Sequence, residues 1–166
     1  MTASIPVWVP VVFLALVFLG YRQSFARTVR PTAVAGMALA MWGFSLYGVM
    51  AAFGSVGWAL GLWAAGYAGV AFMGTRLIAA GSMVVVGASV RLPGSWVPLA
   101  LMLGIFTAKF ALGFAVSVHS PVLQSAGFIA AMSAVLGALS GGFGARALAV
   151  HRVARAAALP SGAVAA

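Results

Sequence analysis

The sequence contains no aspartate, no glutamate and no cysteine, although it carries nine lysine and arginine residues among 166. Without carboxylates, the chain cannot form a paired-carboxylate hydrolase site, a Ser-His-Asp triad, a hard-cation site with acidic ligands or an Asp/Glu proton relay. Without cysteine, it has no disulfide, no thiolate zinc site and no thiol nucleophile. Most catalytic classes are therefore excluded, and the sequence predicts neither a cofactor nor a metal site.

Charged residues of either sign are scarce as well. They make up 5% of the chain against 64% hydrophobic residues, whereas soluble domains have about 25% charged residues. With a mean hydropathy of +1.17, the apolar excess has to face lipid, so the bilayer is the expected partner. A net charge of +9 would suggest nucleic acid in a soluble protein. Here the cations stand singly at the ends of apolar runs, which predicts no nucleic-acid partner.

Five apolar segments approach the roughly 20 helical residues needed to span a bilayer. The sequence therefore predicts an all-α integral membrane protein with five transmembrane helices in one bundle, residues 1–155, followed by a flexible tail, residues 156–166. The predicted helices cover residues 5–21, 33–53, 57–73, 96–118 and 122–145.

The loop charges predict the orientation of this bundle. Eight cations lie in alternate loops and in the tail: Arg22, Arg27, Arg30, Arg76, Arg91, Arg146, Arg152 and Arg155. The turns at residues 54–56 and 119–121 contain no lysine or arginine. Because cytoplasmic loops carry the positive charge, the N-terminus is expected outside and the C-terminus inside. His119 and His151 then lie on opposite sides of the membrane, so they cannot share a metal.

The segment between the third and fourth helices, residues 77–92, is apolar but too short to span. Fourteen residues of it, 77–90, would reach only about 21 Å as a helix, and spanning would place Arg91 outside. The run from Met83 to Val86 is rich in β-branched residues and is flanked by glycine-containing turns. The pattern predicts a short β-hairpin or loop at the cytoplasmic interface, with a re-entrant or interfacial helix as the alternative.

Small residues at every fourth position allow helices in lipid to approach closely. The fifth helix has such a stripe, formed by Ser133, Gly137, Gly141 and Ala145. Similar stripes in the second and third helices are expected to hold the monomer together, because a three-residue turn makes those helices antiparallel neighbours. The stripe of the fifth helix is the predicted contact between protomers of a homo-oligomer.

The ninth cation, Lys109, lies inside an apolar helix, roughly 20 Å from its cytoplasmic end. A charged amine at that depth costs about 2.5 to 3.5 kcal/mol on the insertion scale, and the chain has no acid to offset this cost. Three states stay open: a neutral amine, an ammonium solvated by water and hydroxyl groups, and an ammonium bound to an external anion or acidic residue. The hydroxyl groups considered belong to Thr107, Ser45, Tyr47 and Ser133.

Two functions are compatible with a lysine at this depth. The first is a small oligomeric permease or channel-like protein, in which Lys109 favours an anion or a polar solute. The second is a non-catalytic accessory subunit that docks a larger membrane complex through an acidic residue of the partner. In addition, Arg22, Arg27 and Arg30 are candidates for binding anionic lipid headgroups.

No enzyme is predicted. A Ser–Lys pair is the catalytic arrangement that the composition permits, and it would require Ser45 or Ser133 within about 3 Å of the Lys109 amine.

Two stretches carry a resemblance to a known family. One is Tyr21-Arg22-Gln23-Ser24 with Arg27-Thr28-Val29-Arg30-Pro31, and the other runs from Leu92-Pro93-Gly94-Ser95-Trp96 to Thr107-Ala108-Lys109-Phe110. Together they resemble an uncharacterised family of small multi-pass proteins of the bacterial inner membrane. The resemblance implies that location and agrees with the order of the segments, but it implies no activity.

Overall fold

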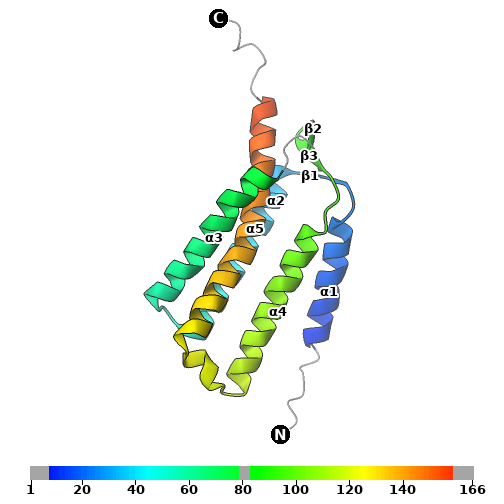
Figure 1. Ribbon diagram of the computed structural model, residues 1–166. Coiled ribbons are helices and arrows are strands. Elements are labelled where there is room, and N and C mark those ends of the chain that lie inside the picture. The colour runs from blue at the N-terminus through cyan, green and yellow to red at the C-terminus, as the bar shows by residue number, and fades with distance from the viewer. Residues whose placement is uncertain (1–7, 79–82, 159–166) are drawn as a thin grey trace, which may run out of the picture.

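The computed structural model describes residues 8–78 and 83–158. Five α-helices run roughly side by side, and three short strands lie at one end of the bundle (Figure 1). The helices are α1 (Trp8–Gln23), α2 (Pro31–Phe53), α3 (Gly57–Leu77), α4 (Val97–Ser117) and α5 (Ala126–Ala158). The strands are β1 (Arg27–Val29), β2 (Val84–Val86) and β3 (Ser89–Leu92), and a 3-10 turn, η2 (Pro121–Gln124), precedes α5.

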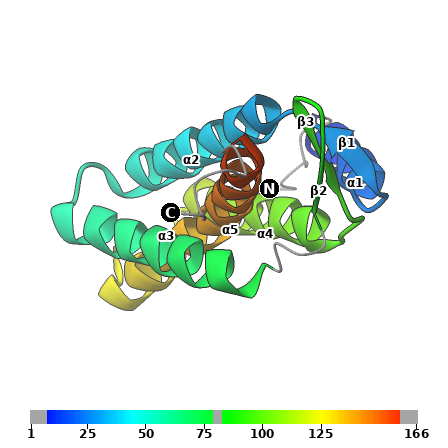
Figure 2. The same ribbon diagram turned by 90° about the horizontal axis from the view of Figure 1, so that it is seen from above.

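Helix α5 is the centre of the bundle. It packs against α2, α3 and α4, while α1 packs on α4 at the edge (Figure 2). One buried cluster, around Val49, Trp63 and Leu136, joins α2 and α3 to α5. Another, which includes Met102 and Phe143, joins α4 to α5. Helix α5 is thus the element against which α2, α3 and α4 all pack.

Close packing between α3 and α5 uses the small residues of α5. All four members of the predicted stripe are buried: Ser133, Gly137, Gly141 and Ala145. A Cβ atom at Gly137 would overlap the backbone carbonyl of Trp63, and one at Gly141 would lie 2.5 Å from the carbonyl oxygen of Tyr67. This stripe is therefore covered by α3 of the same chain. It is therefore not available for the predicted contact with a second copy of the chain.

The corresponding prediction is wrong for α3, whereas Gly48 of the α2 stripe does make a contact within the monomer. The small residues of the α3 stripe are exposed: Gly57, Gly61, Ala65 and Gly69. Helices α2 and α3 each pack mainly on α5 rather than on each other. In α2, Gly48 faces Lys109 of α4. Sequence spacing identified the stripes, but a short turn between two helices does not decide which of their faces meet.

The predicted hairpin is confirmed in the described part of residues 77–92. Strands β2 and β3 pair antiparallel, with Val85 opposite Val90, and Gly87 occupies the turn at φ 58°. Strand β1 adds a third member, in the order β1-β3-β2, and pairs Arg27 with Leu92. The sequence did not predict β1, because three residues are too few to show an alternating pattern.

The described helices include three that are long and apolar enough to cross a membrane, namely α2, α4 and α5. In its described residues, α1 is apolar but shorter. Helix α3 has 21 residues and is long enough to span. Its glycine residues, together with Trp58, Trp63 and Tyr67, lower its mean hydropathy. The mostly helical fold with membrane-compatible helices is thus as predicted.

Several helix boundaries differ from the sequence prediction, and two helices continue four or more residues past their predicted ends. Helix α5 continues to Ala158 instead of ending at residue 145, so residues 156–158 of the predicted flexible tail are helical. Helix α3 continues to Leu77 rather than ending at residue 73. The predicted start of the first helix, residues 5–7, and the remainder of the tail, residues 159–166, lie outside the described residues.

Candidate functional site

Positive charge gathers at the end of the bundle that carries the sheet. The C-terminal ends of α1 and α3 and the C-terminal half of α5 meet there with β1 and β3 (Figure 1). These elements and their flanks supply all eight arginines: Arg22, Arg27, Arg30, Arg76, Arg91, Arg146, Arg152 and Arg155. The opposite end consists of the α2–α3 turn and the α4–α5 connection, which have none.

Lys109 lies away from this end, between α4 and α2. Its Nζ atom is 3.6 Å from the centroid of the Phe44 ring and 5.6 Å from that of Tyr47. Gly48 makes this position possible, because a Cβ atom there would lie 2.6 Å from Cε of Lys109. We call the group formed by Lys109, Phe44, Tyr47 and Gly48 the ammonium cleft.

The ammonium cleft is near the middle of both helices that form it. At 1.5 Å per residue, Lys109 lies about 12 Å from Ser117 at the end of α4. On the same measure, Phe44 lies about 14 Å from Phe53 at the end of α2. Both distances exceed the reach of a lysine side chain, so the amine cannot escape to the neutral end of the bundle.

The two aromatic side chains of the cleft lie on the outer surface of the bundle. The exposed fractions are 49% for Phe44 and 68% for Tyr47. A desolvated cation–π contact contributes about 2 kcal/mol, against about 2.5 to 3.5 kcal/mol for an ammonium in the apolar layer. The contacts with the two rings are therefore comparable in size with that cost, but aromatic rings do not replace the hydrogen-bond acceptors that an amine has in water. No described residue accepts a hydrogen bond from the Lys109 amine.

Four residues were predicted to bring hydroxyl groups to Lys109, and among them Tyr47 has its ring centroid 5.6 Å from the amine. Ser45 donates a hydrogen bond to the carbonyl of Leu136 (2.8 Å) and accepts one from Nε1 of Trp63 (3.0 Å). It thus fastens α2 to α3 and α5. Ser133 is fully buried, and its hydroxyl has no partner among the described atoms. Thr107 is exposed. The expected polar group around Lys109 is not assembled within the described chain.

The three arginines considered for binding lipid headgroups differ in their exposure. Arg22 and Arg30 are exposed, whereas Arg27 is partly buried. Burial, followed by the charge of Arg22, lowers the pKa of Arg27 below that of a free guanidinium. Arg27 lines a cavity of about 170 Å³ together with Gln23 and Arg146.

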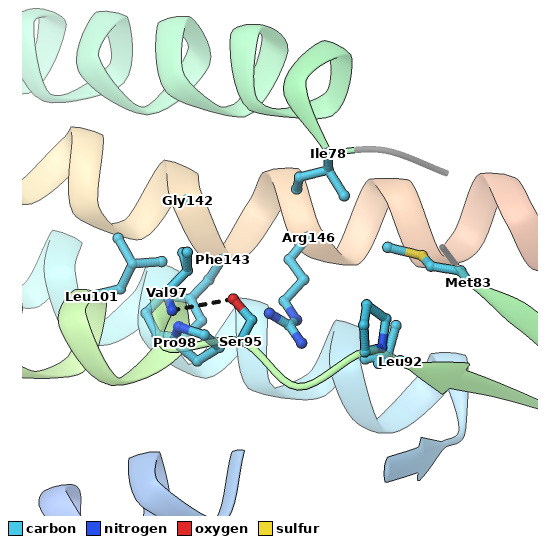
Figure 3. A pocket seen from close by; sticks show the side chains of 11 residues that line it. Ile78, Met83, Leu92, Ser95, Val97, Pro98, Leu101, Gly142, Phe143 and Arg146 are labelled. Carbon is cyan, nitrogen blue, oxygen red and sulfur yellow. Dashed lines mark hydrogen bonds between the residues drawn. The ribbon is translucent and has the colours of Figure 1, made fainter. Parts of the chain in front are cut away.

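Arg146 was not predicted as a site residue. In the sequence it counted only as one of the loop charges that predict membrane orientation. It also lines a second cavity, of about 150 Å³, between α4, α5 and the sheet. Figure 3 shows its side chain extending from α5 toward Ser95 and Leu92. A signal existed: Arg146 shares a helical face with the apolar residues Phe143 and Val150, which is an unusual place for a charge.

Comparison with known proteins places the chain in a family. A model described as a family of unknown function, DUF6622, matches residues 1–161. The chain belongs to this family. The predicted resemblance to an uncharacterised family is thereby confirmed. No curated protein and no solved structure matches the chain.

Proposed function

We propose that the chain spans the bacterial inner membrane five times, with its N-terminus outside and its C-terminus inside. The concentration of arginines at one end supports this orientation through the positive-inside rule. Helices α1 and α3 run alongside α4 and α5, so a bilayer crossed by the latter pair surrounds the former as well. The bacterial inner membrane follows from the resemblance of residues 21–31 and 92–110.

Single-cysteine labelling tests this topology directly, because the natural chain has no cysteine. We expect Ser55→Cys and Ser120→Cys, in the two neutral connections, to react with an impermeant maleimide added to intact cells. Ser24→Cys, at the arginine-rich end, is expected to react only after the cells are permeabilised. Labelling of Ser24→Cys in intact cells would reverse the proposed orientation.

Within that membrane, we infer that the protein is a non-catalytic subunit that docks a larger complex through the ammonium cleft. One observation supports this proposal: the Lys109 amine lies over the Phe44 ring, near the middle of α4, without a hydrogen-bond partner among the described residues and in a chain without aspartate or glutamate. The matching group is an aspartate or glutamate in a transmembrane helix of the partner. A second copy of this chain cannot provide it.

The alternative, a solute pathway through Lys109, has less support from the geometry. A pathway needs polar groups that converge at depth, but Ser45 bonds elsewhere and Ser133 has no polar partner in the described structure. Neither serine is hydrogen-bonded to Lys109 among the described residues. A pathway formed between protomers is a separate outcome of the test below.

Co-purification from native membranes in mild detergent tests the docking proposal. With the natural chain, we expect a different membrane protein to be recovered in stoichiometric amount. Lys109→Met keeps the length of the side chain but removes the charge, and should reduce this recovery at least tenfold, which corresponds to about 1.4 kcal/mol. Thr107→Val, an exposed position on the same helix, is the matched control and should recover the partner fully.

Two outcomes would contradict docking. One is equal recovery with Lys109→Met and the natural chain. The other is the isolation of homo-oligomers alone, accompanied by anion flux in liposomes that is lost in Lys109→Met. That result would support the pathway between protomers instead.

A further inference from the structure

The arginine-rich end contains a charge on an otherwise apolar face of the sheet. In β1, Arg27 and Val29 are partly buried while Thr28 is exposed, so Arg27 lies on the covered face. The neighbouring positions on that face, Val90 and Leu92 of β3, are fully buried against Val150 of α5. A guanidinium in this row has to find polar partners close by.

The described partners of Arg27 are incomplete. Its Nη2 atom donates a hydrogen bond of 3.0 Å to Oε1 of Gln23, and Gln23 is itself only 5% exposed. The Nε–H group of Arg27 is buried and has no hydrogen-bond partner among the described residues. An unpaired buried donor of a charged group costs more than the roughly 1 to 3 kcal/mol of a neutral one.

A second guanidinium faces the same cavity. Arg146 of α5 lines it together with Gln23 and Arg27. Burial, followed by the charge of Arg27, lowers the pKa of Arg146 below that of a free guanidinium. The chain has no aspartate or glutamate that could lie between the two guanidinium groups and pair with them. Two like charges therefore share a partly enclosed space of about 170 Å³ that the protein itself cannot neutralise.

We propose that Gln23, Arg27 and Arg146 form a binding site for a phosphate group. Guanidinium forks bind phosphate oxygens in pairs, and Arg27 and Arg146 supply two such groups at the cavity. The volume is sufficient, since a cavity of about 150 Å³ accommodates benzene and a phosphate has fewer heavy atoms. The phosphate belongs either to an anionic lipid headgroup, which lies at this depth in the proposed topology, or to a soluble compound.

Thermal unfolding of the delipidated, detergent-solubilised protein tests the site and distinguishes the two sources. Inorganic phosphate probes the soluble source, and phosphatidylglycerol in mixed micelles probes the headgroup, with phosphatidylcholine as the zwitterionic reference. At a concentration 100-fold above Kd, the bound probe should raise Tm by about 5 to 10 °C. A shift with inorganic phosphate assigns a soluble compound, and a shift with phosphatidylglycerol alone assigns a lipid.

Variants show whether these arginines cause the shift. Arg146→Gln should abolish it, while its Tm without probe stays equal or rises, because the repulsion from Arg27 is gone. Arg146→Lys keeps the charge without the fork and should retain only part of the shift. Arg152→Gln, an exposed position on the same helix, should retain all of it. The proposal is overturned if neither probe raises Tm, or if the shift survives in Arg146→Gln.

Discussion

Replacing Gly137 with valine is expected to destabilise the bundle by about 3 kcal/mol, at the upper end of overpacking effects. A Cβ atom at this position would meet the backbone carbonyl of Trp63. Because backbone atoms of α3 cannot rotate away as a side chain can, α3 and α5 would have to separate. Detergent-solubilised protein titrated with a denaturing detergent, monitored by tryptophan fluorescence, should show an earlier transition.

Gly127 provides the matched control for this substitution. It lies on the same helix, and a Cβ atom there would have no neighbour within 4 Å. Gly127→Val carries the same change in helix propensity, so it isolates the packing effect. If both variants lost the same amount of stability, close packing of α3 on α5 would not be the cause.

Gly48→Leu is expected to reduce partner recovery at least tenfold, or by about 1.4 kcal/mol, although Lys109 keeps its charge. A side chain at Gly48 would occupy the place of the Lys109 Cε and Nζ atoms, which lie 2.6 and 2.8 Å from the added Cβ. The lysine side chain is flexible, so it can move aside with little effect on folding. Co-purification from native membranes measures the loss, and Tm in detergent verifies the fold.

The control for this change is Gly36→Leu, an exposed position of α2 where an added Cβ meets nothing within 4 Å. It should recover the partner as well as the natural chain does. Full recovery with Gly48→Leu would show that the charge of Lys109 acts without its position over Phe44, which would remove the geometric basis of the ammonium cleft.

Much of the architecture follows from local sequence properties. The five helices come from long apolar runs, and the hairpin comes from a β-branched run between turn residues. Strand β1 could not be predicted in this way, because residues 27–29 become a strand only by pairing with β3, more than sixty positions later in the chain. The extension of α5 beyond residue 145 was missed for a related reason: the part of it around Val150 and Val153 packs against the sheet.

At the candidate sites, too, part of the arrangement follows from the sequence and part only from tertiary contacts. The absence of acids and the depth of Lys109 identified, from sequence alone, a lysine without an acidic partner in its own chain. The direction of its side chain depends on Gly48, a residue from a helix that is distant in sequence. Arg27 and Arg146 are brought together only by the sheet closing over α5. The sequence thus identified Lys109 as unusual but not Arg146, and the tertiary contacts decide what surrounds each of them.

Photo-crosslinking from position 47 in native membranes tests the docking proposal most directly. A photoreactive amino acid in place of Tyr47, at the open side of the ammonium cleft, should form one dominant adduct with a different membrane protein. That protein should carry an aspartate or glutamate in an apolar helix, and the adduct should disappear in Lys109→Met. The same probe at Phe72, an exposed position of α3, should not form it. Adducts at position 47 with only lipid or a second copy of this chain would contradict docking through Lys109.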